Sequence, residues 1–325
     1  MLRDPRDYQI GVLAGLLLYG LTRLHFDISP ARVALTLSAV LVVQWLCTHL
    51  WRLPRLASHF RGAGVLTPQT LPLRGSSQFD PKSALISGLS LCLLLRANDP
   101  ILVVVAAAIA IASKFLLRIR GKHLFNPTNG AIVALLLTTD AVWVSPGQWG
   151  NVMFFGFLMA CLGGLVVHRA LRSDVAYAFI LFYAALLFGR SIYLGEPLAI
   201  PLHRLQAGGL LLFTFFMISD PRTTPDSRTG RVIFAALVAC GAWYVQFRLF
   251  RTNGLLWALA ACALLVPVLD RLFPGSRYTW ADAARRPSGA APQTSPSPSP
   301  RPAVAITSAR VSPTVRGRLV KGLSS

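Results

Sequence analysis

Ten apolar runs occupy most of the first 273 residues of this 325-residue chain, with short polar segments between them. Apolar runs of about 20 residues are typical of transmembrane helices, because the bilayer core offers the backbone no hydrogen-bonding partner outside the helix. Only 14% of the residues are charged, against about 25% in soluble domains. The sequence therefore predicts an all-α polytopic membrane protein with about ten transmembrane helices. The runs lie at residues 8–22, 33–51, 83–95, 100–117, 128–144, 149–167, 174–189, 202–219, 231–250 and 254–273.

The chain carries a formal net charge of +20, from 32 Lys and Arg residues and 12 Asp and Glu residues. A basic excess also occurs in nucleic-acid-binding proteins. Here the basic residues concentrate in alternate loops, as the positive-inside rule requires of a membrane protein. We therefore expect no nucleic-acid partner, and we place the chain in the bacterial inner (cytoplasmic) membrane with both termini in the cytoplasm.

Composition divides the chain into a membrane domain, residues 1–275, and a tail, residues 276–325. The tail is rich in Pro, Ser and basic residues, and it is too poor in apolar surface to fold. We expect a disordered cytoplasmic tail. Its basic residues either lie on anionic lipid headgroups or are simply solvated.

Motifs recur within the membrane domain at a spacing of about 120 residues. The pair Asp99-Pro100 returns as Asp220-Pro221, and Gly88 returns as Gly209. A unit of this length holds five spans, so its second copy enters the membrane from the opposite side. The sequence thus predicts two inverted five-helix repeats, at about 8–144 and 149–273, with a functional site between them.

Short or broken helices are expected near the centre of this arrangement. The run at 83–95 rises only about 20 Å as a helix, against a hydrocarbon core of about 30 Å. Prolines also interrupt or begin several helices. The helix-breaking prolines are Pro100, Pro127, Pro201 and Pro221.

Four polar residues near these breaks are candidates for the central site or for a relay: Asp99, Asn126, His203 and Asp220. A carboxylate at membrane depth is costly and indicates a proton or cation relay. Alternatively, each Asp caps the helix that its proline begins. Asn126 either caps a helix or also contacts a ligand. His203 has no second ligand at a suitable spacing, so no metal site is predicted.

Two blocks of sequence resemble the signatures of the NqrB/RnfD family. The first, residues 83–136, holds Asp99-Pro100, Lys114 and Phe125-Asn126-Pro127, and the second, residues 201–273, holds Asp220-Pro221. Members are membrane subunits of ion-motive NADH:quinone and ferredoxin:NAD electron-transport complexes. The resemblance implies ten spans in inverted repeats, related in fold to ammonium and urea channels, and membrane or redox subunits as partners.

One departure from the family concerns flavin. Members attach FMN to a Thr in a Ser/Thr-Gly-Ala-Thr motif, which the stretch at 138–150 lacks. We therefore predict no covalent flavin, and leave open FMN or riboflavin bound non-covalently. The compact form resembles the branch that includes the enediyne-biosynthesis membrane protein UnbU.

Three functions remain open at this point. In the first, the chain is an electron-transport component, at most a subunit of a membrane oxidoreductase, with non-covalent flavin or a redox centre supplied by a partner. Alternatively, it is a channel or transporter for a small solute or ion. The third alternative is a scaffold subunit without chemistry of its own.

Overall fold

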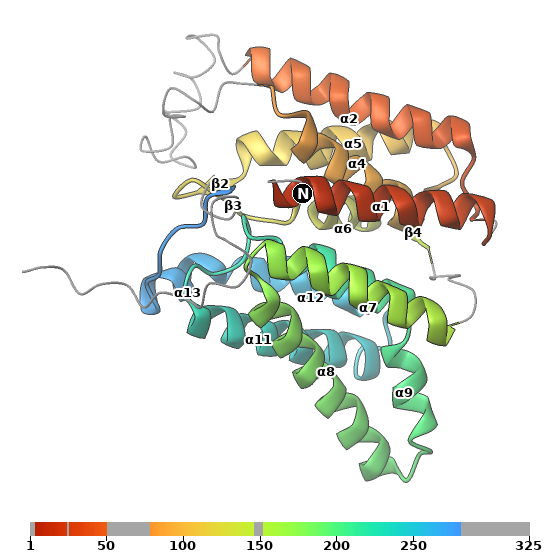
Figure 1. The fold of residues 1–325 in the computed structure, drawn as a ribbon, viewed down its shortest axis with the longest axis vertical. Helices are drawn as coiled ribbons and strands as arrows, with labels where there is room; N and C mark the ends of the chain where they lie inside the picture. The colour runs from red at the N-terminus through yellow and green to blue at the C-terminus, as the bar shows by residue number, and fades with distance from the viewer. Residues whose placement is uncertain (1–3, 25, 51–78, 146–151, 281–325) are drawn as a thin grey trace, which may run out of the picture. The chain divides into compact units, whose positions relative to one another are not determined.

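The structure is a computed structural model that describes residues 4–24, 26–50, 79–145 and 152–280 (Figure 1). Most of these residues are helical. Residues 281–325 of the predicted tail lie outside the described residues, so its disorder and its contact with lipid stay predictions. The described residues before 146 are called the first half below, and those from 152 onward the second half.

The helices of the first half begin with proline in their first turn, and a polar side chain caps several of them. Asp4, Asp80, Asp99 and Asn126 each accept a hydrogen bond from a backbone N–H of the first turn. This combination fixes helix starts, because proline lacks the N–H that the first turn leaves unpaired anyway. The helices are α1 (Pro5–Thr22), α2 (Pro30–Leu50), α4 (Pro81–Leu94), α5 (Pro100–Leu116) and α6 (Pro127–Thr138).

Two short antiparallel ribbons, which the sequence did not predict, join these helices. One pairs β1 (Leu95–Ala97) with β4 (Val142–Val144), and the other pairs β2 (Arg118–Ile119) with β3 (Lys122–His123). β1 directly follows α4 and β4 lies just beyond α6. The pairing satisfies backbone groups where these two short helices end.

The second half begins with two long helices, α7 (Val152–Arg169) and α8 (Ser173–Leu194). A broken segment follows, made of α9 (Ala199–Leu205), α10 (Gly208–Leu212) and a π-helical turn, η2 (Phe213–Met217). The long helix α11 (Arg228–Phe247) comes next. The last two helices, α12 (Gly254–Ala263) and α13 (Val266–Leu272), meet at a bend of 51°.

Three of the described helices, α2, α8 and α11, are long and apolar enough to cross a membrane, and the bent pair α12–α13 makes a fourth candidate. Shorter apolar helices accompany them, namely α4, α5, α6 and the α10–η2 segment. The structure is therefore that of a helical membrane protein. The larger number of ten spans in inverted repeats stays a prediction.

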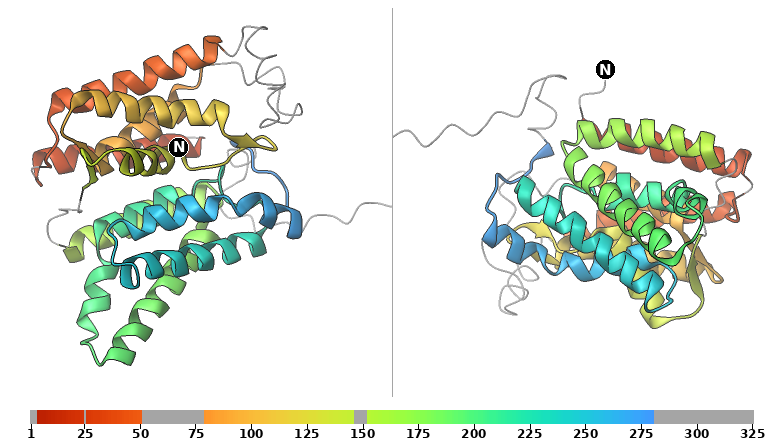
Figure 2. Two further views of the ribbon diagram at one scale, coloured as in Figure 1. Left: turned by 180° about the vertical axis from the view of Figure 1, so that it is seen from behind. Right: turned by 90° about the horizontal axis from the view of Figure 1, so that it is seen from below.

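Packing follows the same scheme in each half. In the first half α1 packs against α4, α2 against α5, and α5 against α6; in the second half α7 packs against α10, α8 against α11, and α11 against α12 (Figures 1 and 2). Between the halves, α1 contacts α7 and α6 contacts α12. Small side chains permit these approaches. The buried alanines of α5 and α11 include Ala106, Ala107, Ala110, Ala235, Ala239 and Ala242.

Candidate functional site

Charged and polar side chains from several helix ends meet in one connected region, which we call the polar end. It contains side chains from the starts of α1, α4, α8 and α11, from the β2–β3 ribbon and from α13. Arg6 lies over the ring of Trp280, which packs on Tyr278, and Tyr278 in turn lies under Arg172. Ion pairs reinforce the region. They join Arg6 to Asp80, Lys82 to Asp4 and Asp7, Arg231 to Asp174, and Lys122 to Asp226 and Asp270.

Asn126 and Asp220 meet at the centre of the polar end, one from each half of the chain. Asn126 is buried, and its Oδ1 caps α6 by accepting from the Asn129 N–H. Its Nδ2 donates to Asp220 Oδ2 at 3.3 Å and to the Met217 carbonyl at 3.4 Å. Burial raises the pKa of the Asp220 carboxyl above its usual value. A carboxyl that is reluctant to ionise and held by an amide from the other half is suited to carry a proton or a cation.

Lys114 brings a buried positive charge close to this pair. Its Nζ donates to the carbonyl oxygen of Ser83 at 2.7 Å and to the Ser83 hydroxyl at 3.0 Å. No carboxylate forms a salt bridge with Lys114 among the described residues, although Asp220 is the carboxylate with the strongest electrostatic effect on it. Lys114 therefore supplies an ammonium group whose charge acts on Asp220 through space.

The β2–β3 ribbon adds further basic groups. Burial lowers the pKa of Arg118 to about 10 and holds the pKa of His123 well below its usual range. The neighbouring charges of Arg118, Arg222 and Lys114 depress the pKa of His123 further. His123 is therefore neutral at physiological pH.

The other two predicted site residues lie elsewhere. Asp99 is exposed beside the β1–β4 ribbon, where its Oδ1 caps α5 by accepting from the Ile101 N–H at 2.8 Å. His203 is exposed on α9. The structure thus brings Asn126 and Asp220 together and leaves Asp99 and His203 apart from them.

The four predicted prolines also differ in their positions. Pro100 and Pro127 begin α5 and α6. Pro201 is buried within the short helix α9, and Pro221 lies in the turn that follows η2. The breaks in the second half therefore coincide with the α9–α10–η2 segment that leads to Asp220.

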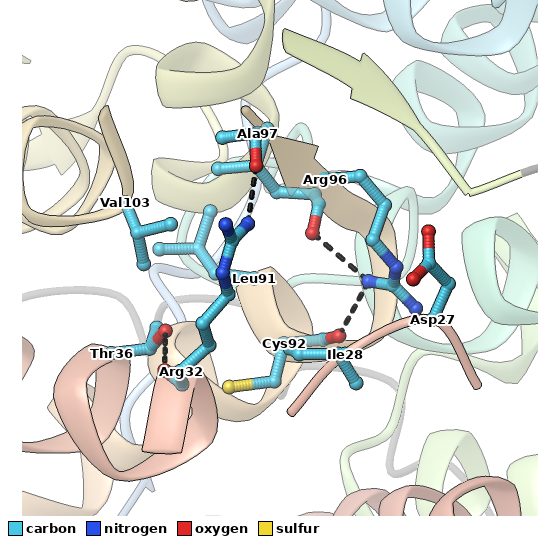
Figure 3. Close-up of a pocket in the computed structure, with 10 residues that line it drawn as sticks. Asp27, Ile28, Arg32, Thr36, Leu91, Cys92, Arg96, Ala97 and Val103 are labelled. Carbon is cyan, nitrogen blue, oxygen red and sulfur yellow. Dashed lines mark hydrogen bonds between the residues drawn. The ribbon is translucent and has the colours of Figure 1, made fainter. Parts of the chain in front are cut away.

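A small cavity lies near the β1–β4 ribbon, between Arg32 and Arg96 (Figure 3). Arg96 is buried, and its Nη1 donates to the carbonyls of Cys92 and Leu95, both at 2.9 Å. Arg32 donates to the Ala97 carbonyl. The cavity measures about 10 Å³, which is room for about one water molecule.

A larger cavity of about 120 Å³ opens between the β2–β3 ribbon and α13 at the polar end. Its lining includes Lys122, His123, Asp226, Asp270 and Arg277. Pockets for drug-sized ligands measure about 300–1,000 Å³. Both cavities fall below this range, so neither of the two provides an enclosed pocket of that size.

Two hydroxyls in the stretch where flavinylated members carry their cofactor form local hydrogen bonds, and residues 146–150 of that stretch lie outside the described residues. The hydroxyl of Thr138 donates to the carbonyls of Ala134 and Leu135, and the hydroxyl of Thr139 accepts from the Ala141 N–H. Both side chains thus complete the end of α6. Among the residues that the structure describes, no cluster of three His, Cys, Asp or Glu side chains is arranged to hold a metal ion.

Sequence reasoning missed several members of the polar end. Lys122, Asp226 and Asp270 come from three separate segments, and neither a motif nor a spacing links them. Lys114 and Asp270 did belong to the two signature blocks, but no role was assigned to them. Arg172 carried no signal beyond its place between two apolar runs.

Comparison with known proteins places the chain in context. Residues 137–279 match the sequence model of the NQR2, RnfD, RnfE family. The chain is similar to a subunit of the ion-translocating oxidoreductase complex of Pectobacterium carotovorum subsp. carotovorum (strain PC1), with 30% identity over 128 residues, covering 38% of this chain and 34% of the relative. The corresponding subunits of Citrobacter koseri and Escherichia coli (strain K12) are each 27% identical over 125 residues, with the same coverage. The chain thus matches about a third of the length of these relatives. The predicted resemblance to the NqrB/RnfD family is confirmed.

Proposed function

We propose that this chain is an RnfD-like membrane subunit of an ion-translocating oxidoreductase complex, whose redox centres reside in partner subunits. The similarity of residues 137–279 to the NQR2, RnfD, RnfE family, and to subunits of such complexes, carries the proposal. The two cavities described above support the second part, because both are smaller than a typical ligand pocket. Electrons would therefore pass through the partner subunits, and this subunit would take part in translocating the ion.

The proposal includes ten spans arranged as two inverted five-helix repeats with both termini in the cytoplasm. The matched packing of the two halves supports it, since α1–α4, α2–α5 and α5–α6 correspond in order to α7–α10, α8–α11 and α11–α12. The contacts α1–α7 and α6–α12 pair helices that are equivalent in the two repeats. Such contacts are expected along the twofold axis of an inverted repeat.

Within this architecture, Asp220 is the proposed relay residue and Asn126 positions it. The amide of Asn126 fixes one oxygen of the carboxyl, while the Arg222 N–H donates to the other at 3.0 Å. Burial raises the pKa of Asp220 and so favours its protonated form more than water favours that of a surface carboxyl. The ammonium of Lys114 stabilises the ionised form.

Isolation from native membranes tests the proposal as a whole. A tagged full-length chain is expected to co-purify with membrane subunits that carry flavin or iron–sulfur absorbance, and to be colourless once separated from them. Accessibility tags at the two termini are expected to report the same face of the membrane. A monomeric chain without redox partners, or termini on opposite faces, would refute it.

A channel or transporter is the second candidate, and the meeting of Asn126 and Asp220 between the halves favours it. It requires ion or solute flux in proteoliposomes without any partner. Asp220→Asn is then expected to abolish the flux, and Asp99→Asn, which retains a helix cap, is the matched control. The scaffold role and the link to enediyne biosynthesis stay predictions.

A further inference from the structure

Arg172 is a buried guanidinium that forms no ion pair with any of the described carboxylates. It lies in the short connection between α7 and α8, and it is 5% exposed. Its Nε donates to the Thr224 hydroxyl at 3.2 Å, and its Nη1 donates to the Leu171 carbonyl at 3.2 Å. Its Nη2 is buried and has no hydrogen-bond partner among the described residues. A buried charge left in this state is costly, so a missing partner is indicated.

Tyr278 supplies a second donor at the same place. The guanidinium carbon of Arg172 lies 4.7 Å from the centre of the Tyr278 ring. The Tyr278 hydroxyl is buried and also lacks a partner among the described residues. Burial raises its pKa above the usual value, so the hydroxyl keeps its proton. The two unpartnered groups therefore both offer hydrogens.

The start of α8 adds to this positive environment. Arg172 is the N-cap residue of this 22-residue helix and its side chain forms no cap, while Asp174 in the first turn accepts from the Val175 N–H at 2.9 Å. The N–H groups at a helix start carry a partial positive charge that favours anions. The remaining N–H groups at the start of α8 thus act in the same sense as the two side chains, because they also offer hydrogens.

Two nearby carboxylates, Asp174 and Asp226, are paired with other cations, whereas Asp220, whose charge also acts on Arg172, is held by the Asn126 amide and the Arg222 N–H. Asp174 accepts from Nε and Nη2 of Arg231 at 2.8 and 2.5 Å. Asp226 pairs with Lys122. Burial lowers the pKa of Arg172 to about 10, and the guanidinium still carries its charge at neutral pH. Arg172 thus forms no ion pair of its own among the described residues.

We propose that Arg172, Tyr278 and the start of α8 bind one phosphate group. The free Nη2 of the guanidinium and the Tyr278 hydroxyl can both donate to the oxygens of a tetrahedral oxyanion, and hydrogen bonds between charged groups are the strong ones. A water molecule would satisfy the hydrogen bonds but not the charge. The phosphate comes either from the headgroup of an acidic phospholipid or from a soluble phosphate. This inference is independent of the electron-transport role proposed above.

Thermal unfolding of the detergent-purified full chain tests the proposal. The additives are inorganic phosphate, micelles doped with phosphatidylglycerol, and micelles doped with zwitterionic phosphatidylcholine. Stabilisation by phosphatidylglycerol alone identifies a lipid headgroup site, and stabilisation by inorganic phosphate identifies a site open to soluble phosphate. Stabilisation by neither, or equal stabilisation by phosphatidylcholine and phosphatidylglycerol, overturns the proposal.

Three variants locate the effect. Arg172→Gln is expected to weaken the apparent affinity about tenfold to a hundredfold, and Tyr278→Phe about threefold to tenfold. Arg204→Gln is the matched control, because Arg204 also stacks on an aromatic ring, that of Phe247 at 5.1 Å, but is exposed. Tyr278→Phe keeps the stacked ring, so it still tests the site if Arg172→Gln does not accumulate. Wild-type affinity in both site variants, or equal losses in all three, overturns the proposal.

Discussion

Lys122 forms ion pairs between the two halves of the chain. Its replacement by Met should measure how much these ion pairs contribute to the free energy of unfolding. Its Nζ lies 2.7 Å from Asp270 Oδ2 and 3.1 Å from Asp226 Oδ1. The three side chains are 11%, 13% and 13% exposed. The other oxygen of Asp270 accepts from the Asp226 N–H at 2.8 Å. Lys122→Met keeps the methylene stem but leaves two adjacent carboxylates without a cation.

The expected cost is large because these carboxylates are mostly buried. Removal of one partner from a buried ion pair costs about 3–5 kcal/mol. The residual exposure of the triad places Lys122→Met near the lower limit, at about 3 kcal/mol, which is more than a hundredfold in the unfolding constant.

Lys82→Met is the matched control. Lys82 also pairs with two carboxylates, Asp7 at 2.6 Å and Asp4 at 3.2 Å, but its side chain is 37% exposed. Solvent-exposed pairs contribute about 0–1 kcal/mol. The two substitutions therefore remove the same group and differ in the burial of the pair.

Unfolding in mixed micelles by titration with sodium dodecyl sulfate, followed by tryptophan fluorescence, gives both free energies. A raised salt concentration should weaken the Lys82 pair and leave the Lys122 triad almost unchanged, because buried pairs are poorly screened. Equal losses for Lys122→Met and Lys82→Met would refute the reasoning.

Three further predictions follow from single contacts. Asp99→Ala should destabilise the chain by about 1 kcal/mol in the same titration, and Asp99→Asn by almost nothing, because both Asp and Asn cap helices. Gly163→Ala should cost about 1–3 kcal/mol, because a Cβ there would lie 2.4 Å from the Phe215 ring; Gly164→Ala, where the nearest atom is 3.6 Å away, is the control. The depressed pKa of His123 stabilises the fold above the ordinary value of 6.5, and that contribution is lost as the pH falls below it. The thermal midpoint of wild type should therefore fall more steeply below about pH 6.5 than that of His123→Gln.

Local features of the fold could be predicted from the sequence. The Asp-Pro and Asn-Pro pairs at 99–100 and 126–127 mark helix starts, because proline fixes the backbone and the preceding side chain caps it. The short run at 83–95 corresponds to α4, which ends at Leu94. In contrast, β1 continues the apolar run of α4 and pairs with a segment more than 40 residues away. No local pattern could predict that pairing.

The candidate site was predicted only in part, for a related reason. Asn126 and Asp220 stood out because each adjoins a proline within an apolar stretch. Their contact depends on where the start of α6 meets the end of η2, at Asn126 and Met217, which is a long-range property. The triad of Lys122, Asp226 and Asp270 joins residues that are more than 100 positions apart in the case of Lys122. By sequence its members are ordinary loop and helix-end residues, so no local pattern marks them.

The repeated motif does not by itself define the site. In both copies the Asp side chain accepts from the backbone N–H two residues further on, at 2.8 Å for Asp99 and 3.0 Å for Asp220. The Asp-Pro pair therefore encodes a turn. Asp220 differs because its second oxygen accepts from Asn126. The stretch from Leu124 to Gly130 is echoed from Leu249 to Gly254, where Arg251 alone replaces Asn126 and Pro127, so the second copy does not repeat the amide. A proton or cation relay is thus expected at the Asp220 turn and not at the Asp99 turn, because only Asp220 has the Asn126 amide as its partner.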